Sequence, residues 1–465
     1  MRFKLDFLSV LVYLPFIVFF ALLVCFHSGV PYFGPDDYTF KTFLGQLMQL
    51  NWDNLMIYRY FHWSSRLLID CLLPIFCNLP IQVWMFIDSC LICFMSALIP
   101  RLLVSDFKDF DLKNKTIFNC TSIFLVLIFY VCAYAYDINL AGYITTSLNY
   151  VWPFVFALLH FYLIKYYVIN NNININSVIS NSIINDSEGN LDSRVSFYGF
   201  WRKFALYFLI FFSLIFAISQ EMVLCLILGA YLFIIPYYYY KKAKIPKIFF
   251  YSFILCVLMS VFVFLSPGNK ERYFLTSIPN YLYTYQSSLL GKVYMGLAIF
   301  FNQLITKVDI VSYLFFAVFG IYIYSHVKSR FSVFSMVPFL VLNIVYFLGF
   351  IQFQPLVKVL NEVKTSTILT HSMIPVMIYL VLVVFVLFSL FLLFREGERF
   401  VSVSFLFSLV LVFLSQFLLG FFPVDFIHGS RWRIVYWGVL ILLTAFMLYN
   451  LLEYSDEDSN SSTDF

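Results

Sequence analysis

Charge is what this sequence has least of. Only 12% of its 465 residues are Asp, Glu, Lys or Arg, whereas 62% are hydrophobic and 22% are aromatic. Soluble globular domains carry about twice that share of charged residues. Together with a mean hydropathy of +0.88, this excludes a soluble domain. The net charge of +4 is spread over many short polar segments, which indicates membrane topology and not nucleic-acid binding.

Metal-ligand patterns are missing as well. The nine cysteines nearly all fall inside apolar runs, and the CxxC formed by Cys90 and Cys93 has no second CxxC or His pair to complete a zinc site. The six histidines show no ligand spacing either. We therefore expect the cysteines to be small apolar packing residues.

Long apolar runs are abundant, and runs of roughly 18 or more residues predict membrane helices. The sequence predicts an all-α polytopic membrane protein with about twelve transmembrane helices, at 7–27, 80–100, 117–136, 148–168, 203–218, 221–240, 248–265, 308–325, 331–351, 373–394, 400–420 and 434–452. Residues 66–77 stop at Pro74 and Asn78, too soon to cross alone. A crossing at 289–305 would give thirteen spans.

The polar segments divide the chain. Residues 1–275 form a predicted transmembrane core, and residues 276–452 form the C-terminal transmembrane helices. The core contains an external loop, 28–65, in which Phe40–Leu50 has the spacing of an interfacial helix. It also contains the Asn-rich segment 169–196, which we expect to be a disordered cytoplasmic loop. Residues 453–465 are an acidic cytoplasmic tail.

Basic residues set the expected orientation. Arg2 and Lys4 precede the first apolar run, which is too long for a signal peptide and lacks a cleavage site, so we expect an uncleaved first span with its basic end in the cytoplasm. Four lysines at 241–247 give a second cytoplasmic signal. The distribution of Lys and Arg does not choose between twelve and thirteen spans, but both alternatives place Asp36 and Asp37 outside.

Four polar clusters then share the outer face. Their candidate functional residues are Asp36 and Asp37 with Arg59 and Arg66; Asn149; Glu221; and Asn269 with Arg272. With twelve spans, His428, Arg431 and Arg433 join them. Paired carboxylates suit proton abstraction or the binding of a divalent cation, and arginine suits phosphate binding. An enzyme that takes a sugar from a lipid phosphate needs a base and positive charge.

The order of these motifs resembles a known family. DDY follows the first span, WSSR ends the same loop, TTSLNYVWP opens span four, SQE joins spans five and six, and SPGNKER follows span seven. Over residues 1–275 this order resembles a bacterial multi-pass family related to Gtr-type O-antigen glucosyltransferases of the GT-C superfamily. That resemblance implies an inverting glycosyltransferase of the bacterial cytoplasmic membrane. Its partners would be a polyprenyl-phosphate-linked sugar donor, a glycan or glycolipid acceptor and the lipid bilayer.

The resemblance also implies roles for the residues. An acidic residue in the first external loop is the expected base, here Asp37 or Asp36, and Glu221 matches an acidic position between spans five and six. Gln220 and Met222 beside it depart from the His or Asn that the family often has there. We expect Glu221 and Asn149 to orient the sugar, and Arg272, with Arg59, Arg66 or Arg431, to neutralise the departing phosphate.

Two other function classes stay open. A transporter or flippase that uses protons needs ionisable groups in span centres, and Asp88 is the clear candidate. The sequence shows no inverted repeat of the kind that many transporters have. An O-antigen polymerase or ligase would centre on an arginine-bearing external loop in the second half, such as 270–307 or 352–371.

Overall fold

Almost all of the residues that the computed structural model describes are helical. The structure describes residues 12–29, 34–47, 52–62, 65–104, 111–135, 143–182, 192–269, 288–293, 309–354, 373–417 and 433–461, and these contain no β-strand. Within them, nine helices are long and apolar enough to cross a membrane. Helices suit this role because they satisfy every backbone polar group internally, which lipid cannot do. The protein is thus an all-α, multi-pass membrane protein.

The first half of the chain contains most of the short helices. Its elements are α2 (Leu14–Ser28), α3 (Pro35–Leu47), α4 (Trp52–His62), α5 (Leu67–Asn78), α6 (Ile81–Leu103), α7 (Leu112–Ala135), α8 (Tyr143–Thr146), a π-helical turn η1 (Ser147–Val151), α9 (Trp152–Ser182), α10 (Asp192–Ile218), α11 (Glu221–Tyr240) and α12 (Lys247–Leu265). The described part of the second half contains fewer elements. It contains α16 (Ile310–His326), a 3-10 helix η3 (Arg330–Met336), α17 (Val337–Phe350), α19 (Met373–Arg395), α20 (Arg399–Phe417) and α22 (Arg433–Ser461).

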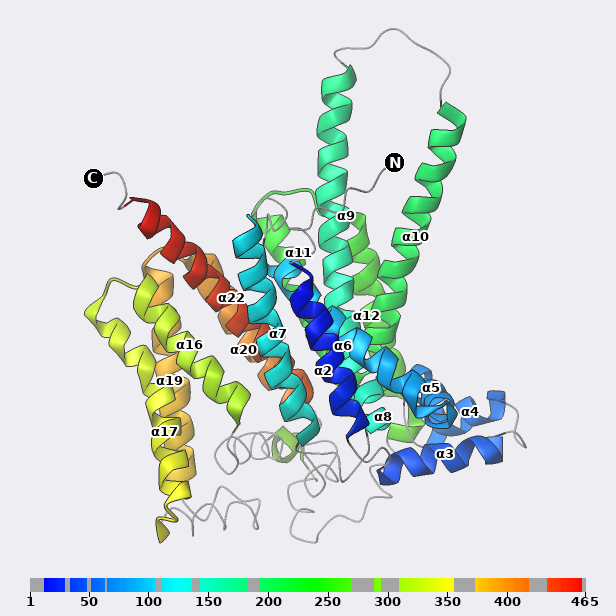
Figure 1. The fold of residues 1–465 in the computed structure, drawn as a ribbon, viewed down its shortest axis with the longest axis horizontal. Coiled ribbons are helices and arrows are strands. Elements are labelled where there is room, and N and C mark those ends of the chain that lie inside the picture. The colour runs from blue at the N-terminus through cyan, green and yellow to red at the C-terminus, as the bar shows by residue number, and fades with distance from the viewer. Residues whose placement is uncertain are drawn as a thin grey trace.

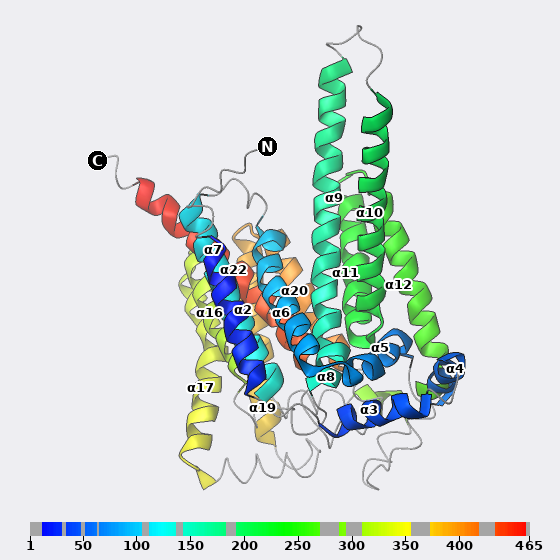
Figure 2. The same cartoon turned by 45° about the vertical axis from the view of Figure 1, so that its right-hand side comes forward.

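All the predicted spans coincide with an apolar helix. Three of these helices, Leu14–Ser28, Ile310–His326 and the Arg399–Ser415 part of α20, are shorter than 18 residues. The short α5 confirms that the apolar segment before Asn78 stops early. The interfacial helix expected at 40–50 begins earlier, as α3, and α3 and α5 lie across one end of the bundle (Figures 1 and 2). We call this end the site end.

The segment 169–196, which the sequence predicts to be a disordered loop, is helical in the parts that the structure describes. Helix α9 continues to Ser182 and α10 already begins at Asp192, so both project beyond the other helices at the end opposite the site end (Figures 1 and 2). Extending a helix that is already nucleated adds one hydrogen bond per residue without a new nucleation step. The modest helix propensity of Asn is therefore enough here.

The chain leaves α12 and enters α16 at the same end of the bundle. Ser266 Oγ, just after α12, donates to Tyr60 O of α4 at 3.0 Å. Asp309, which caps α16, lies 3.6 Å from Arg433 at the start of α22. Figure 1 shows both helix ends on the side of α3 and α8, and it shows α22 ending on the opposite side. Most of the possible span 289–305 lies outside the described residues.

Packing is tight where α22 passes the start of α9. A Cβ atom added at Gly438 would lie 2.5 Å from the Phe154 ring, so only glycine allows this approach. Trp437 and Ile441 beside it are buried. Many apolar side chains elsewhere point outward, such as Leu258 and Phe264 of α12. Such outward apolar surface is expected where lipid replaces water as the solvent.

Candidate functional site

Asp37 is buried at the site end, in the first turn of α3. Its side chain is 0% exposed. Its Oδ1 atom accepts hydrogen bonds from Thr145 N at 2.8 Å and from Thr145 Oγ1 at 2.6 Å, and its Oδ2 atom faces Gly34 N at 3.4 Å. Burial raises the pKa of Asp37 from 3.8 to about 6, against the opposing effect of the hydrogen bonds from Thr145 and Gly34. The carboxyl group therefore titrates close to neutral pH.

Thr145 connects Asp37 to the π-helical turn. Its carbonyl oxygen accepts a hydrogen bond from Asn149 Nδ2 at 2.8 Å. Asn149 lies in η1, where Trp152 N–H donates to Ser147 O five residues back instead of four. Such wider turns are rare and are frequent at functional sites. The sequence pointed to Asn149 but not to Thr145, although both lie in the TTSLNYVWP motif.

Arg66 and Glu221 form an ion pair beside this turn. Arg66 Nε donates to Glu221 Oε2 at 2.6 Å, and Arg66 Nη1 donates to Asn149 Oδ1 at 3.2 Å. The guanidinium also lies over the Tyr150 ring, 5.6 Å from its centroid. Burial is the largest effect and opposes the charged form of Arg66, but the interactions with Glu221 and Tyr150 together outweigh it and hold the pKa of Arg66 above its usual range. The two charges cancel.

Ser65 and Asn269 complete the arrangement. Ser65 Oγ donates to Glu221 Oε1 at 3.2 Å, and Asn269 Nδ2 donates to Ser65 Oγ at 3.1 Å. One chain of hydrogen bonds thus joins Asp37, Thr145, Asn149, Arg66, Glu221, Ser65 and Asn269. We call these seven residues the polar network. They come from the five sequence motifs, which lie up to 232 positions apart in the chain (from 37 to 269).

Comparison with protein-family models, with curated proteins and with solved structures found no match for this chain. The polar network must therefore be interpreted from its own chemistry. Its cation, Arg66, is paired with the carboxylate of Glu221, and Asp37 is its third ionisable group. Uptake or release of one proton by Asp37 changes the net charge of the seven residues between zero and −1.

Arg59 belongs to a neighbouring pair. Its Nε and Nη2 atoms each lie 3.0 Å from one oxygen of Asp70 in α5, a bidentate arrangement. The guanidinium also lies 5.4 Å from the centroid of Phe40 in α3. Arg59 therefore holds three short helices together. Asp70 was not selected from the sequence, although a single carboxylate within an apolar segment was a signal for a buried pair.

The other predicted site residues are separated from the polar network or lie outside the described residues. Asp36 is half-buried on α3. Arg272 and Arg431 lie outside the described residues. Arg433 is buried against Asp309, and Trp437 Nε1 donates to both oxygens of Asp309, at 2.9 and 3.0 Å.

A second buried polar cluster lies inside the bundle. His27 Nε2 lies 3.1 Å from Asp88 Oδ2, and Trp152 Nε1 donates to Asp88 Oδ1 at 2.6 Å. Tyr130 Oη lies 2.7 Å from His27 Nε2. These residues belong to α2, α6, α7 and α9. An ionisable group within membrane helices is costly unless it is paired, and here Asp88 is.

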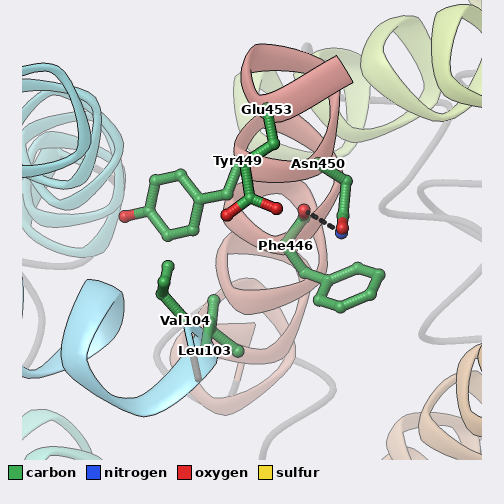
Figure 3. Close-up of a pocket in the computed structure, with 6 residues that line it drawn as sticks. All are labelled: Leu103, Val104, Phe446, Tyr449, Asn450 and Glu453. Atoms are coloured by element: carbon green, nitrogen blue, oxygen red, sulfur yellow. Dashed lines mark hydrogen bonds between the residues drawn. The ribbon is translucent and has the colours of Figure 1, made fainter. Parts of the chain in front are cut away.

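Two cavities lie away from the polar network. Figure 3 shows one of about 140 Å³ between the end of α6 and the later turns of α22, at the end of the bundle opposite Asp37; it is lined by Leu103, Val104, Phe446, Tyr449, Asn450 and Glu453. The other, of about 380 Å³, is a groove between α16, α19, α20 and α22 whose lining is entirely apolar. In the described part of the chain, no three His, Cys, Asp or Glu residues gather as a metal site.

Proposed function

We propose that the protein is a membrane glycosyltransferase with a GT-C-like fold. It would move a sugar from a polyprenyl-phosphate donor to a cell-surface glycan or glycolipid, on the outer face of a bacterial cytoplasmic membrane. One observation carries the proposal. Five polar motifs, distant in sequence, meet around a buried carboxylate at one end of an apolar bundle. A bundle whose only task is structural has little use for this costly arrangement.

Twelve crossings and an external site end fit the arrangement of the helices. Helix α12 ends and α16 begins at the site end (Figure 1), which favours twelve crossings over thirteen. The lysines that join α11 to α12 lie at the opposite end, as do Arg101 and Lys165. Basic residues favour the cytoplasmic side, so the site end would face outward.

Asp37 is the proposed general base. A base is most effective when its pKa lies near the working pH, and the pKa of Asp37 of about 6 meets this condition. Its Oδ2 atom, which has the longer contact, would take the proton from an acceptor hydroxyl. The hydroxyl oxygen then bonds to the anomeric carbon while the bond from that carbon to the phosphate oxygen breaks. The lipid phosphate leaves with both bonding electrons, and the configuration inverts.

The neighbouring residues would bind the sugar. Glu221, Asn149 and Asn269 offer carboxylate and amide groups that suit neutral hydroxyls. Arg66 and Arg59 are each paired with a carboxylate, so we assign the departing phosphate to Arg272 and Arg431. Because Asp37 is fully buried by contacts of α3 with α5 and α8, substrate can reach it only when α3 shifts.

Transfer of radiolabelled glucose from polyprenyl-phosphate glucose to membrane glycans tests this proposal. Membranes containing the wild-type protein should transfer label, and Asp37→Asn should lower the rate by about 10²–10⁴-fold, the usual contribution of a general base. Asp36→Asn is the matched control, because it removes the same charge from the same helix turn. Asp37 is not the base if Asp37→Asn keeps full activity, and the whole mechanism is wrong if both variants keep it.

The buried His27–Asp88 pair favours a second candidate, a proton-coupled transporter. Proton carriers keep such groups inside the bundle. In proteoliposomes with a pH-sensitive dye inside, a transporter would move protons when a transported sugar is added. Asp88→Asn would abolish this movement and Asp37→Asn would not. Transfer of label that survives Asp88→Asn would support the glycosyltransferase.

A further inference from the structure

Thr145 connects Asp37 and Asn149 within the polar network, because two of its groups hydrogen-bond to Asp37 and a third hydrogen-bonds to Asn149. Its N–H and hydroxyl both donate to Asp37 Oδ1, and its carbonyl oxygen accepts from Asn149 Nδ2. The side chain is 4% exposed, so water hardly competes for these bonds. Thr145 thus connects Asp37 directly to the π-helical turn.

From the turn, the connection continues to the ion pair. Asn149 Oδ1 accepts from Arg66 Nη1 at 3.2 Å while Arg66 Nε is held by Glu221 at 2.6 Å. Hydrogen bonds in a buried chain polarise one another, so a change at one end is felt at the other. A continuous series of hydrogen-bonded groups therefore connects the carboxylates of Asp37 and Glu221.

We propose that Thr145 is a positioning residue that couples Asp37 to the Arg66–Glu221 ion pair through Asn149. Thr145 fixes the orientation of the Asp37 carboxylate and stabilises its ionised form. Asn149 in turn fixes the carbonyl of Thr145 by one hydrogen bond and accepts another from Arg66, so it links the position of the guanidinium to that of Thr145. The inference rests on the proposed function only for its meaning in catalysis, because the coupling itself is a property of the folded protein.

Other ionisable groups face Asp37 and must be separated from this effect. Cys77 of α5 interacts electrostatically with Asp37 and with Lys41 of α3. Asp36 is the preceding residue of α3, and Tyr143 lies in α8, two residues before Thr145. These groups act through space, whereas the proposed coupling requires the hydrogen bonds of Thr145 and Asn149.

Labelling with the hydrophobic carbodiimide dicyclohexylcarbodiimide tests the coupling without an activity assay. The reagent modifies protonated buried carboxyl groups, so the fraction of Asp37 labelled at each pH, read by peptide mass spectrometry, gives its titration midpoint. A hydrogen bond to a charged group is typically equivalent to about 1–2 pH units. Thr145→Val should therefore raise the midpoint by about that amount, and Thr145→Ser should restore it.

Asn149→Ala tests the second step, because the hydrogen bonds given above connect Asn149 to Asp37 only by way of Thr145. The proposed relay runs from Arg66 through Asn149 and Thr145 to Asp37, so the titration midpoint of Asp37 should move in Asn149→Ala. Lys41→Gln should leave the shift caused by Thr145→Val unchanged. An unmoved midpoint in Thr145→Val overturns the positioning role. An unmoved midpoint in Asn149→Ala overturns the relay. If Thr145→Val does not fold, Thr145→Ser still tests the proposal. Serine keeps the hydroxyl group, so a midpoint of Asp37 in this variant that differs from the wild-type value contradicts the proposal.

The two proposals fail in distinguishable ways. If the midpoint moves as expected but no variant or wild-type membrane transfers sugar, the glycosyltransferase proposal fails and the coupling stands. If sugar is transferred but the midpoint does not respond to Thr145 or Asn149, the coupling fails and the enzyme stands. If both hold, the pH profile of transfer in Thr145→Val should move with the labelling midpoint.

Discussion

Replacing Asp37 with Asn should stabilise the protein at neutral pH. The rise of the Asp37 pKa from 3.8 to about 6 means that the folded protein holds this proton more tightly than the unfolded chain does. Stability is therefore greatest below pH 4 and falls as the pH rises through 6. The full loss is about 3 kcal/mol, since each pH unit corresponds to 1.36 kcal/mol.

Asn carries no charge, so the free energy of unfolding of the variant does not fall in this way as the pH rises. Its amide oxygen can still accept the two bonds from Thr145, but its NH₂ group would face Gly34 N and lose that longer bond, worth about 1 kcal/mol. The expected net gain is about 2 kcal/mol at pH 7.5. At pH 4 the gain should vanish or reverse, because the wild-type carboxyl is then protonated.

Equilibrium unfolding in mixed micelles, followed by tryptophan fluorescence at several pH values, measures this difference. Asp36→Asn is the matched control, since Asp36 is half-buried and the bonds from Thr145 go to Asp37. If the free energies of unfolding of Asp37→Asn and wild type differ by the same amount at pH 4 and at pH 7.5, the reasoning is refuted. A variant that is less stable than wild type at pH 7.5 would also refute it.

Three further substitutions test the contacts that hold the helices together, at the site and elsewhere in the bundle. Glu221→Gln should lower the free energy of unfolding by about 3 kcal/mol because it removes the carboxylate that neutralises the charge of Arg66, and adding Arg66→Met should recover much of the loss. Lys165→Met should cost about 2 kcal/mol, measured by thermal unfolding, because Nζ holds three carbonyls at the end of α6 at 2.6–3.0 Å; Lys165→Arg is its control. Gly438→Ala should cost about 1–3 kcal/mol by overpacking, and Phe154→Leu should relieve part of it.

Much of the fold was predictable from the sequence because lipid imposes a simple rule. An apolar run must form a helix there, and every predicted span coincides with one. Helix ends were less predictable. Helix α10 begins at Asp192, eleven residues before the predicted span at 203, because polar residues can continue a helix that the membrane segment has already nucleated.

The site was predictable as a set of residues but not as a set of bonds. A common topology placed Asp37, Asn149, Glu221 and Asn269 on one face, and the structure joins them. The pairings of Arg66 with Glu221 and of Arg59 with Asp70 depend on how α4, α5 and α11 pack, which local sequence does not encode. Thr145 escaped selection for a similar reason, since its role follows from its distance to Asp37.

The pH dependence of kcat/KM for sugar transfer tests the central claim most directly. If Asp37 is the base, activity requires its ionised form, so it should be high above the pKa and fall as the pH drops through about 6. The account predicts half-maximal kcat/KM near pH 6, with a slope of one proton. Activity that stays constant down to pH 4.5 would contradict it.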